Sequence, residues 1–188
     1  MRLRDWDSAR VSWLNMASCE QLFLDCSVRR LRQTAGRIED CLGRLTDEEI
    51  WARQTENENS VANLVLHLSG NVRQWIIGGV GGQPDIRERD TEFAARGGAA
   101  KADLAKLLRD TVENAAKVIE TLPAGQLPEE ITVQGYNLSV LEAIYHVVEH
   151  FSGHTGQIIF ATKLLTGEDL GYYQHLRGAA AAHAERTP

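Results

Sequence analysis

Three of the six histidines recur at intervals of four residues, at His146, His150 and His154. A step of four residues turns about 400° in an α-helix, so these side chains form one gently drifting row. Two histidines at i and i+4 can bind one metal ion, because their Cβ atoms lie only about 5–6 Å apart. His146 and His154 are about 12 Å apart along the axis, so all three cannot bind the same ion. The row therefore contains two candidate pairs, and both include His150.

A third ligand can come from another helix. His67 lies between Leu66 and Leu68, near the middle of a second predicted helix. The interiors of helix bundles collect metal ligands from facing helices. A single histidine in an apolar segment is more often a hydrogen-bonded core residue, and a histidine row can also be a polar face near solvent. A row and a third histidine together indicate a site for one divalent metal ion.

The segment from His146 to His150 also fits His-x-x-Glu-His, the signature of inverzincin metalloproteases. In that interpretation His146 and His150 bind zinc and Glu149 is the general base. A five-residue pattern arises easily by chance in a helix rich in histidine and glutamate, and no clear acidic ligand follows it. A surface position, or a supporting role beside a ligand, is the simpler interpretation of Glu149.

Composition limits the classes of partner. The formal net charge of −6 argues against binding to a phosphate backbone, so we expect no nucleic-acid partner. No apolar run approaches membrane-spanning length, and the acidic N-terminal residues differ from a secretory signal. The three cysteines form no Cys-x-x-Cys pair, and their odd number favours reduced thiols. We therefore expect a cytoplasmic protein without a membrane partner.

The elements that must position the histidines are helices, because apolar residues recur at helical spacing in four stretches and none shows sustained alternation. The capping-box patterns at Thr46–Glu49 and Ser139–Glu142 mark helix starts, and Gly36 is a candidate break in the first helix. A short extended piece is expected at 131–133. The predicted helices span about 11–45, 59 or 60 to 77, 103–122, and 139–166.

The expected architecture is all-α, a four-helix bundle in a single domain that covers residues 1–188. A long surface connection, rich in glycine and charge, joins the second and third helices at 81–100. The alanine-rich tail from about 178 to 188 is expected to be mobile.

The segment from Asn59 to Asn71, NSVANLVLHLSGN, and the later segment HFSGHTGQ, which ends at Gln157, resemble the DinB/YfiT-like superfamily of metal-dependent proteins. The resemblance covers nearly the whole chain. It implies an up-down-down-up bundle, often a homodimer, with zinc or nickel bound by His67, His150 and His154. His146 then lies outside the set of ligands. Members often carry an arginine after the last histidine, where this chain has Thr155.

Characterised relatives are similar to transferases and isomerases that use bacillithiol, mycothiol or glutathione, and many members have no demonstrated activity. Three neutral nitrogen ligands leave a coordination position open, as in catalytic zinc sites. Asn71 and Gln157 lie one helical turn from ligands and could orient a substrate, or be surface amides. The resemblance thus implies a metal-dependent transferase or isomerase that acts on a small molecule with a low-molecular-weight thiol. The alternative is a non-catalytic metal-binding or stress-response module.

Overall fold

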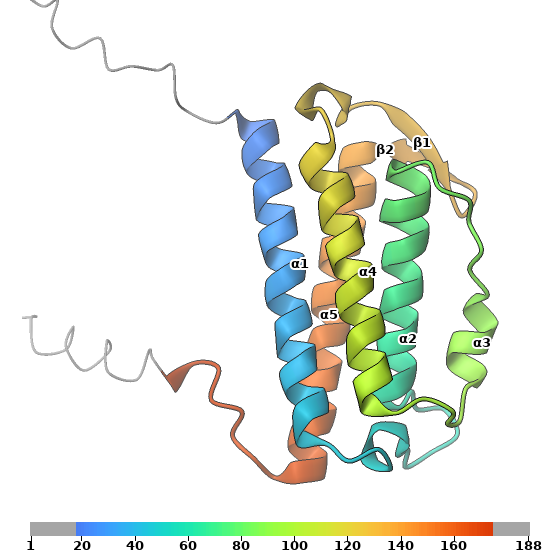
Figure 1. The fold of residues 1–188 in the computed structure, drawn as a ribbon, viewed down its shortest axis with the longest axis vertical. Coiled ribbons are helices and arrows are strands. Elements are labelled where there is room, and N and C mark those ends of the chain that lie inside the picture. Colours follow the sequence, from blue (N-terminus) through green and yellow to red (C-terminus); the bar gives the residue numbers. More distant parts are fainter. Residues whose placement is uncertain (1–17, 175–188) are drawn as a thin grey trace, which may run out of the picture.

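Four long helices pack side by side in the computed structural model, which describes residues 18–174 (Figure 1). Helices α1 and α5 run in one direction and α2 and α4 in the other, which gives the predicted up-down-down-up bundle. The predicted start of the first helix at Val11 and the predicted mobile tail lie outside the described residues. The long helices are α1 (Cys19–Arg44), α2 (Val61–Val72), α4 (Lys101–Thr121) and α5 (Val140–Thr166).

Helix α5 has the start and end that its sequence predicts. The Ser139 hydroxyl accepts from the backbone N–H of Glu142, and the Glu142 carboxylate accepts from the backbone N–H of Ser139, at 3.2 and 2.8 Å. The helix ends at Gly167, whose φ of 71° is left-handed, the conformation that glycine adopts without a steric penalty. These caps set where α5 begins and ends.

Two other helices differ in detail from the sequence prediction. Helix α1 runs through Gly36 without a break, because the flanking Ala35 and Ile38 are buried in the core and their packing outweighs the roughly 1 kcal/mol cost of an interior glycine. Helix α2 continues past Val72 as a π-helix, η3 (Arg73–Val80), so the chain stays helical through the glycines that were expected to stop it.

The connection between α2 and α4 contains a short helix, α3 (Arg89–Ala94), which lies against α2. A hairpin precedes α5, in which β1 (Glu130–Val133) pairs antiparallel with β2 (Tyr136–Ser139). Strand β1 confirms the predicted extended piece at 131–133, whereas the sequence did not indicate β2. The single-turn helices η2 (Glu49–Trp51) and η4 (Ala124–Gln126) complete the elements of residues 18–174.

The core runs the length of the bundle and fixes the helices against one another. Its largest fully buried side chains come from all four long helices and from η3, and include Leu31, Ile38, Leu68, Ile76, Leu108, Ile119 and Phe151. No helix within residues 18–174 is long and apolar enough to span a membrane.

Candidate metal centre

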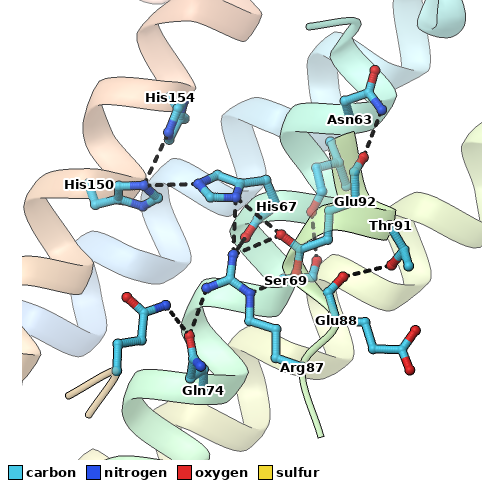
Figure 2. A network of polar contacts seen from close by, with 12 residues as sticks. Asn63, His67, Ser69, Gln74, Arg87, Glu88, Thr91, Glu92, His150 and His154 are labelled. Atoms are coloured by element: carbon cyan, nitrogen blue, oxygen red, sulfur yellow. Dashed lines mark hydrogen bonds and ion pairs between the residues drawn. The ribbon is translucent and has the colours of Figure 1, made fainter. Parts of the chain in front are cut away.

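His67 on α2 meets His150 and His154 on α5 (Figure 2). The Nε2 atom of His150 lies 3.1 Å from Nε2 of His67 and 3.2 Å from Nε2 of His154. One nitrogen from each ring can be chosen so that all three lie within 4.8 Å of one another. Tetrahedral zinc with bonds of about 2.0–2.1 Å holds its ligand nitrogens about 3.3–3.4 Å apart. The distances from His150 to the other two rings are close to this value, so the three side chains could hold one divalent ion.

Hydrogen bonds on the outer side of two rings determine which nitrogen carries the proton. Nδ1 of His67 lies 3.1 Å from a carboxylate oxygen of Glu92, and Nδ1 of His154 lies 2.7 Å from the amide oxygen of Gln157. The amide oxygen of Gln157 can only accept, so Nδ1 of His154 carries the proton and its Nε2 keeps the lone pair. Nδ1 of His67 also lies 3.1 Å from Nη2 of Arg87, which is a donor, so the tautomer of His67 depends on which of the two partners it bonds. When both rings carry the proton on Nδ1, two lone pairs face Nε2 of His150, which can donate only one hydrogen, and a cation satisfies this arrangement better than hydrogen bonds can.

The electrostatic environment keeps the α5 histidines neutral. Burial lowers the pKa of His150 to about 3, and the neighbouring His154 and His67 add to the effect. Burial also lowers the pKa of His154, although its hydrogen bond to Gln157 opposes the shift. Metal coordination needs the neutral ring, so this environment suits a ligand at neutral pH.

His146 lies one turn from His150 but is not part of the group of three. Its ring packs on Trp75 of η3, with the ring centroids 4.3 Å apart. Helices α2 and α5 are antiparallel, and the ring of His67 on α2 lies beside those of His150 and His154 on α5. Glu149 is exposed. The structure therefore gives the inverzincin pattern no third ligand among residues 18–174.

The two amides that were predicted to orient a substrate have different surroundings. Gln157 is exposed and contacts His154 directly, so it supports a candidate ligand. Asn71 is buried, and its Oδ1 has no hydrogen-bond partner within residues 18–174. Nδ1 of His150 and Nε1 of Trp75 are buried without a partner in the same part of the chain. The prediction that Asn71 orients a substrate stays untested, because its side chain is buried among the helices.

The sequence did not predict the contacts that the connection after α2 makes with His67. Glu92 reaches His67 from α3, and the ring of Phe93 packs on His67 at a centroid distance of 4.7 Å. Burial raises the pKa of Glu92, but the hydrogen bonds from Arg87 and His67 outweigh it and hold the pKa below its usual range. One available signal was Gly70, because a glycine inside a strong helix often marks a close packing contact.

The chain is similar to one protein family and to several solved structures. A family model described as "Protein of unknown function (DUF1572)" matches residues 18–178. No curated protein matches the chain significantly. Similar solved structures include a conserved protein from Enterococcus faecalis, with 16% identity, a TM-score of 0.67, and coverage of 77% of this chain and 97% of that chain.

Two further solved structures are described as DinB-like. YjoA from Bacillus subtilis has 16% identity and a TM-score of 0.61, covering 79% of this chain and 97% of that chain. A protein from Bacillus cereus has 13% identity and a TM-score of 0.62, covering 75% of this chain and 91% of that chain. The bundle described above is thus a DinB-like fold, and at these identities the likeness concerns the fold alone.

Proposed function

We propose that this chain, which belongs to the family of proteins of unknown function DUF1572, binds one divalent metal ion through His67, His150 and His154. The observation that carries the proposal is the convergence of three rings from two helices, in which Nε2 of His150 lies 3.1 Å from Nε2 of His67 and 3.2 Å from Nε2 of His154. Zinc and nickel are among the divalent ions that imidazole nitrogens bind, and they are the ions that the family resemblance implies.

We further propose that the site is catalytic. Within residues 18–174 no fourth cysteine, aspartate, glutamate or histidine joins the group, which leaves a coordination position for an exogenous molecule. A bound ion would supply Lewis-acid chemistry, which activates a thiol or a water at neutral pH. His150 and His154 would hold the ion from α5, while Gln157 keeps the proton of His154 on Nδ1.

The proposed reaction is transfer of a low-molecular-weight thiol to a small electrophilic substrate, or isomerisation with such a thiol. The resemblance of the two histidine segments to the DinB/YfiT-like superfamily supports this class. In a transfer, the thiolate sulfur forms a bond to the electrophilic carbon and the leaving group departs with the bonding electrons. A non-catalytic metal-binding module is the alternative, and it differs in that the loaded protein would bind metal without turnover.

Metal titration of histidine variants tests the ligand set. We expect His67→Ala and His154→Ala to lose bound zinc or nickel, measured by mass spectrometry of metal content and by competition with a chromophoric chelator. His146→Ala is the matched control, because it removes a histidine from the same row of α5 that is not one of the three proposed ligands, although its ring lies 5.5 Å from that of His150. Loss of metal in His146→Ala with retention in His154→Ala would exclude this ligand set.

Activity is tested separately on the loaded protein. The zinc and nickel forms are screened with glutathione, bacillithiol and mycothiol against a panel of electrophiles, and products are identified by mass. Thiol-dependent product that disappears in His154→Ala is the expected result. Tight metal binding with no product for any thiol supports the non-catalytic alternative.

A further inference from the structure

The connection between α2 and α4 carries an ion pair that is buried beside His67. Nε of Arg87 donates to Oε1 of Glu92, and Nη2 of Arg87 donates to Oε2, both at 2.7 Å. The side chains are only 3% and 10% exposed. Figure 2 shows this pair on one side of His67 and the α5 histidines on the other. Burying two charges carries a large desolvation cost, so a pair at this position calls for a local explanation.

Further bonds attach the pair to α2 and η3. Nη1 of Arg87 donates to the side chain of Gln74 at 2.9 Å. The amide of Asn63 donates to the backbone oxygens of Glu92 and Ala95, at 2.8 and 3.0 Å, and so fastens α3 to α2. The Glu92 carboxylate is therefore held in one place by contacts that come from both sides of it.

Gly70 is the residue that lets the carboxylate approach. A Cβ atom at this position would lie 1.9 Å from Oε1 of Glu92 and 2.9 Å from Nε of Arg87. Any other residue would drive the carboxylate away from α2, where His67 lies one turn before Gly70. The absence of a side chain at position 70 is thus a condition for the contact between Glu92 and His67.

Nδ1 of His67 has two polar neighbours at the same distance, Oε2 of Glu92 and Nη2 of Arg87, each at 3.1 Å. Arg87 can only donate. If Nδ1 accepted from Arg87, the proton of His67 would sit on Nε2, and that nitrogen could not bind a metal. Nη2 carries two hydrogens, and both have an oxygen acceptor, Oε2 of Glu92 at 2.7 Å and the backbone oxygen of His67 at 3.4 Å. The carboxylate in turn accepts most strongly when Nδ1 donates to it, which leaves the Nε2 lone pair facing His150.

We propose that Glu92 and Arg87 are positioning residues, which hold His67 as the tautomer and in the orientation that metal binding requires. The inference rests on the proposed function, and it assigns to the α2–α4 connection a role in the metal site. A carboxylate that accepts from the outer nitrogen of a ligand histidine raises the basicity of the ring, and loss of such a partner typically weakens metal affinity by about 10- to 100-fold.

The test uses the full-length protein with Glu92→Gln and the control Glu88→Gln. Glu88 precedes α3 in the same connection, and its exposed side chain is not among the hydrogen-bond partners of His67 within residues 18–174, so the control removes the same charge elsewhere. We expect Glu92→Gln to weaken zinc affinity about 10- to 100-fold and Glu88→Gln to leave it within about twofold. Circular dichroism of the metal-free proteins checks that both remain folded.

A second readout needs no bound metal, and its first measurement is made on the wild-type protein. Long-range ¹H–¹⁵N correlation spectra of the metal-free wild-type protein report which nitrogen of His67 carries the proton, and we expect Nδ1. Glu92→Gln is expected to raise the fraction protonated on Nε2. Loss of packing alone would not move this signal in a protein that keeps its fold.

The outcomes separate the inference from the proposed function. A wild-type protein that binds neither zinc nor nickel contradicts the proposed function, whatever the tautomer of His67. If the wild type binds metal through the three histidines, the inference is overturned by either of two results. One is a proton on Nε2 of His67 in the metal-free protein, and the other is equal zinc affinity in Glu92→Gln and Glu88→Gln.

Discussion

Replacing Gly70 by alanine is expected to separate Glu92 from His67 and to weaken metal binding without touching a ligand. The added Cβ would lie 1.9 Å from Oε1 and 2.8 Å from Cδ of Glu92, whereas real Cβ atoms essentially never come within 3.0 Å of another heavy atom. The carboxylate must therefore retreat by about 1.1 Å. Nε of Arg87 would also lie 2.9 Å from the added atom, so both partners of the 2.7 Å hydrogen bond must leave the positions that they hold beside His67.

The expected size of the effect follows from two opposing contributions. Alanine is better than glycine inside a helix by about 1 kcal/mol. Disruption of a buried ion pair costs about 3–5 kcal/mol when one partner is removed. Both partners remain in Gly70→Ala and can turn toward solvent, so the loss is smaller. We expect the free energy of unfolding to fall by about 1–3 kcal/mol, and zinc affinity to fall about 10- to 100-fold, as for Glu92→Gln.

Gly36→Ala is the matched control, because Gly36 lies inside α1 with nothing within 4 Å of the added atom. It should raise the free energy of unfolding by up to about 1 kcal/mol and leave zinc affinity unchanged. Urea denaturation of the metal-free proteins measures stability, and competition with a chelator measures affinity. A Gly70→Ala protein that is stabilised like Gly36→Ala and binds zinc like the wild type would refute the reasoning.

Two further predictions concern pH and assembly. The folded metal-free protein holds the pKa of His150 near 3, whereas the unfolded chain has a value of about 6.5. Between these values the unfolded state binds more protons than the folded state. The free energy of unfolding should therefore fall as the pH is lowered through this range, by up to about 1.4 kcal/mol per pH unit. Urea denaturation at several pH values should show a smaller slope in His150→Gln, and equal slopes would contradict the assignment. Phe160 and Leu164, 64% and 62% exposed on α5, favour a homodimer. Sedimentation should then show a dimer that Phe160→Asp dissociates, whereas a monomeric wild type at micromolar concentration would rule it out.

The sequence predicted the bundle because most of its signals are local. The apolar stripes of the four long helices, the cap at Ser139 and the stop at Gly167 act over a few residues, and the structure shows each of them. The pairing of His150 with His154 is also local, because a four-residue step places both side chains on one face of a helix. These features depend on chain geometry alone, whatever packs against the helix.

Local signals were insufficient where packing decides the conformation. Gly36 suggested a break in α1, but the buried neighbours of Gly36 hold the helix straight through it. Strand β2 has no periodic pattern of its own. It forms because a turn at Gln134 and Gly135, both with positive φ, folds it back onto β1.

The tertiary structure shows how the candidate metal site is assembled. Residue spacing alone left two candidate histidine pairs open, and the family resemblance singled out His150 and His154. The antiparallel packing of α2 and α5 is what sets His67 beside this pair and leaves His146 against Trp75. Glu92 reaches the outer nitrogen of His67 only because the connection after α2 folds back over Gly70. Both contacts join residues that are far apart in sequence, and their geometry is set by the packing of whole elements, which no pattern of neighbouring residues encodes.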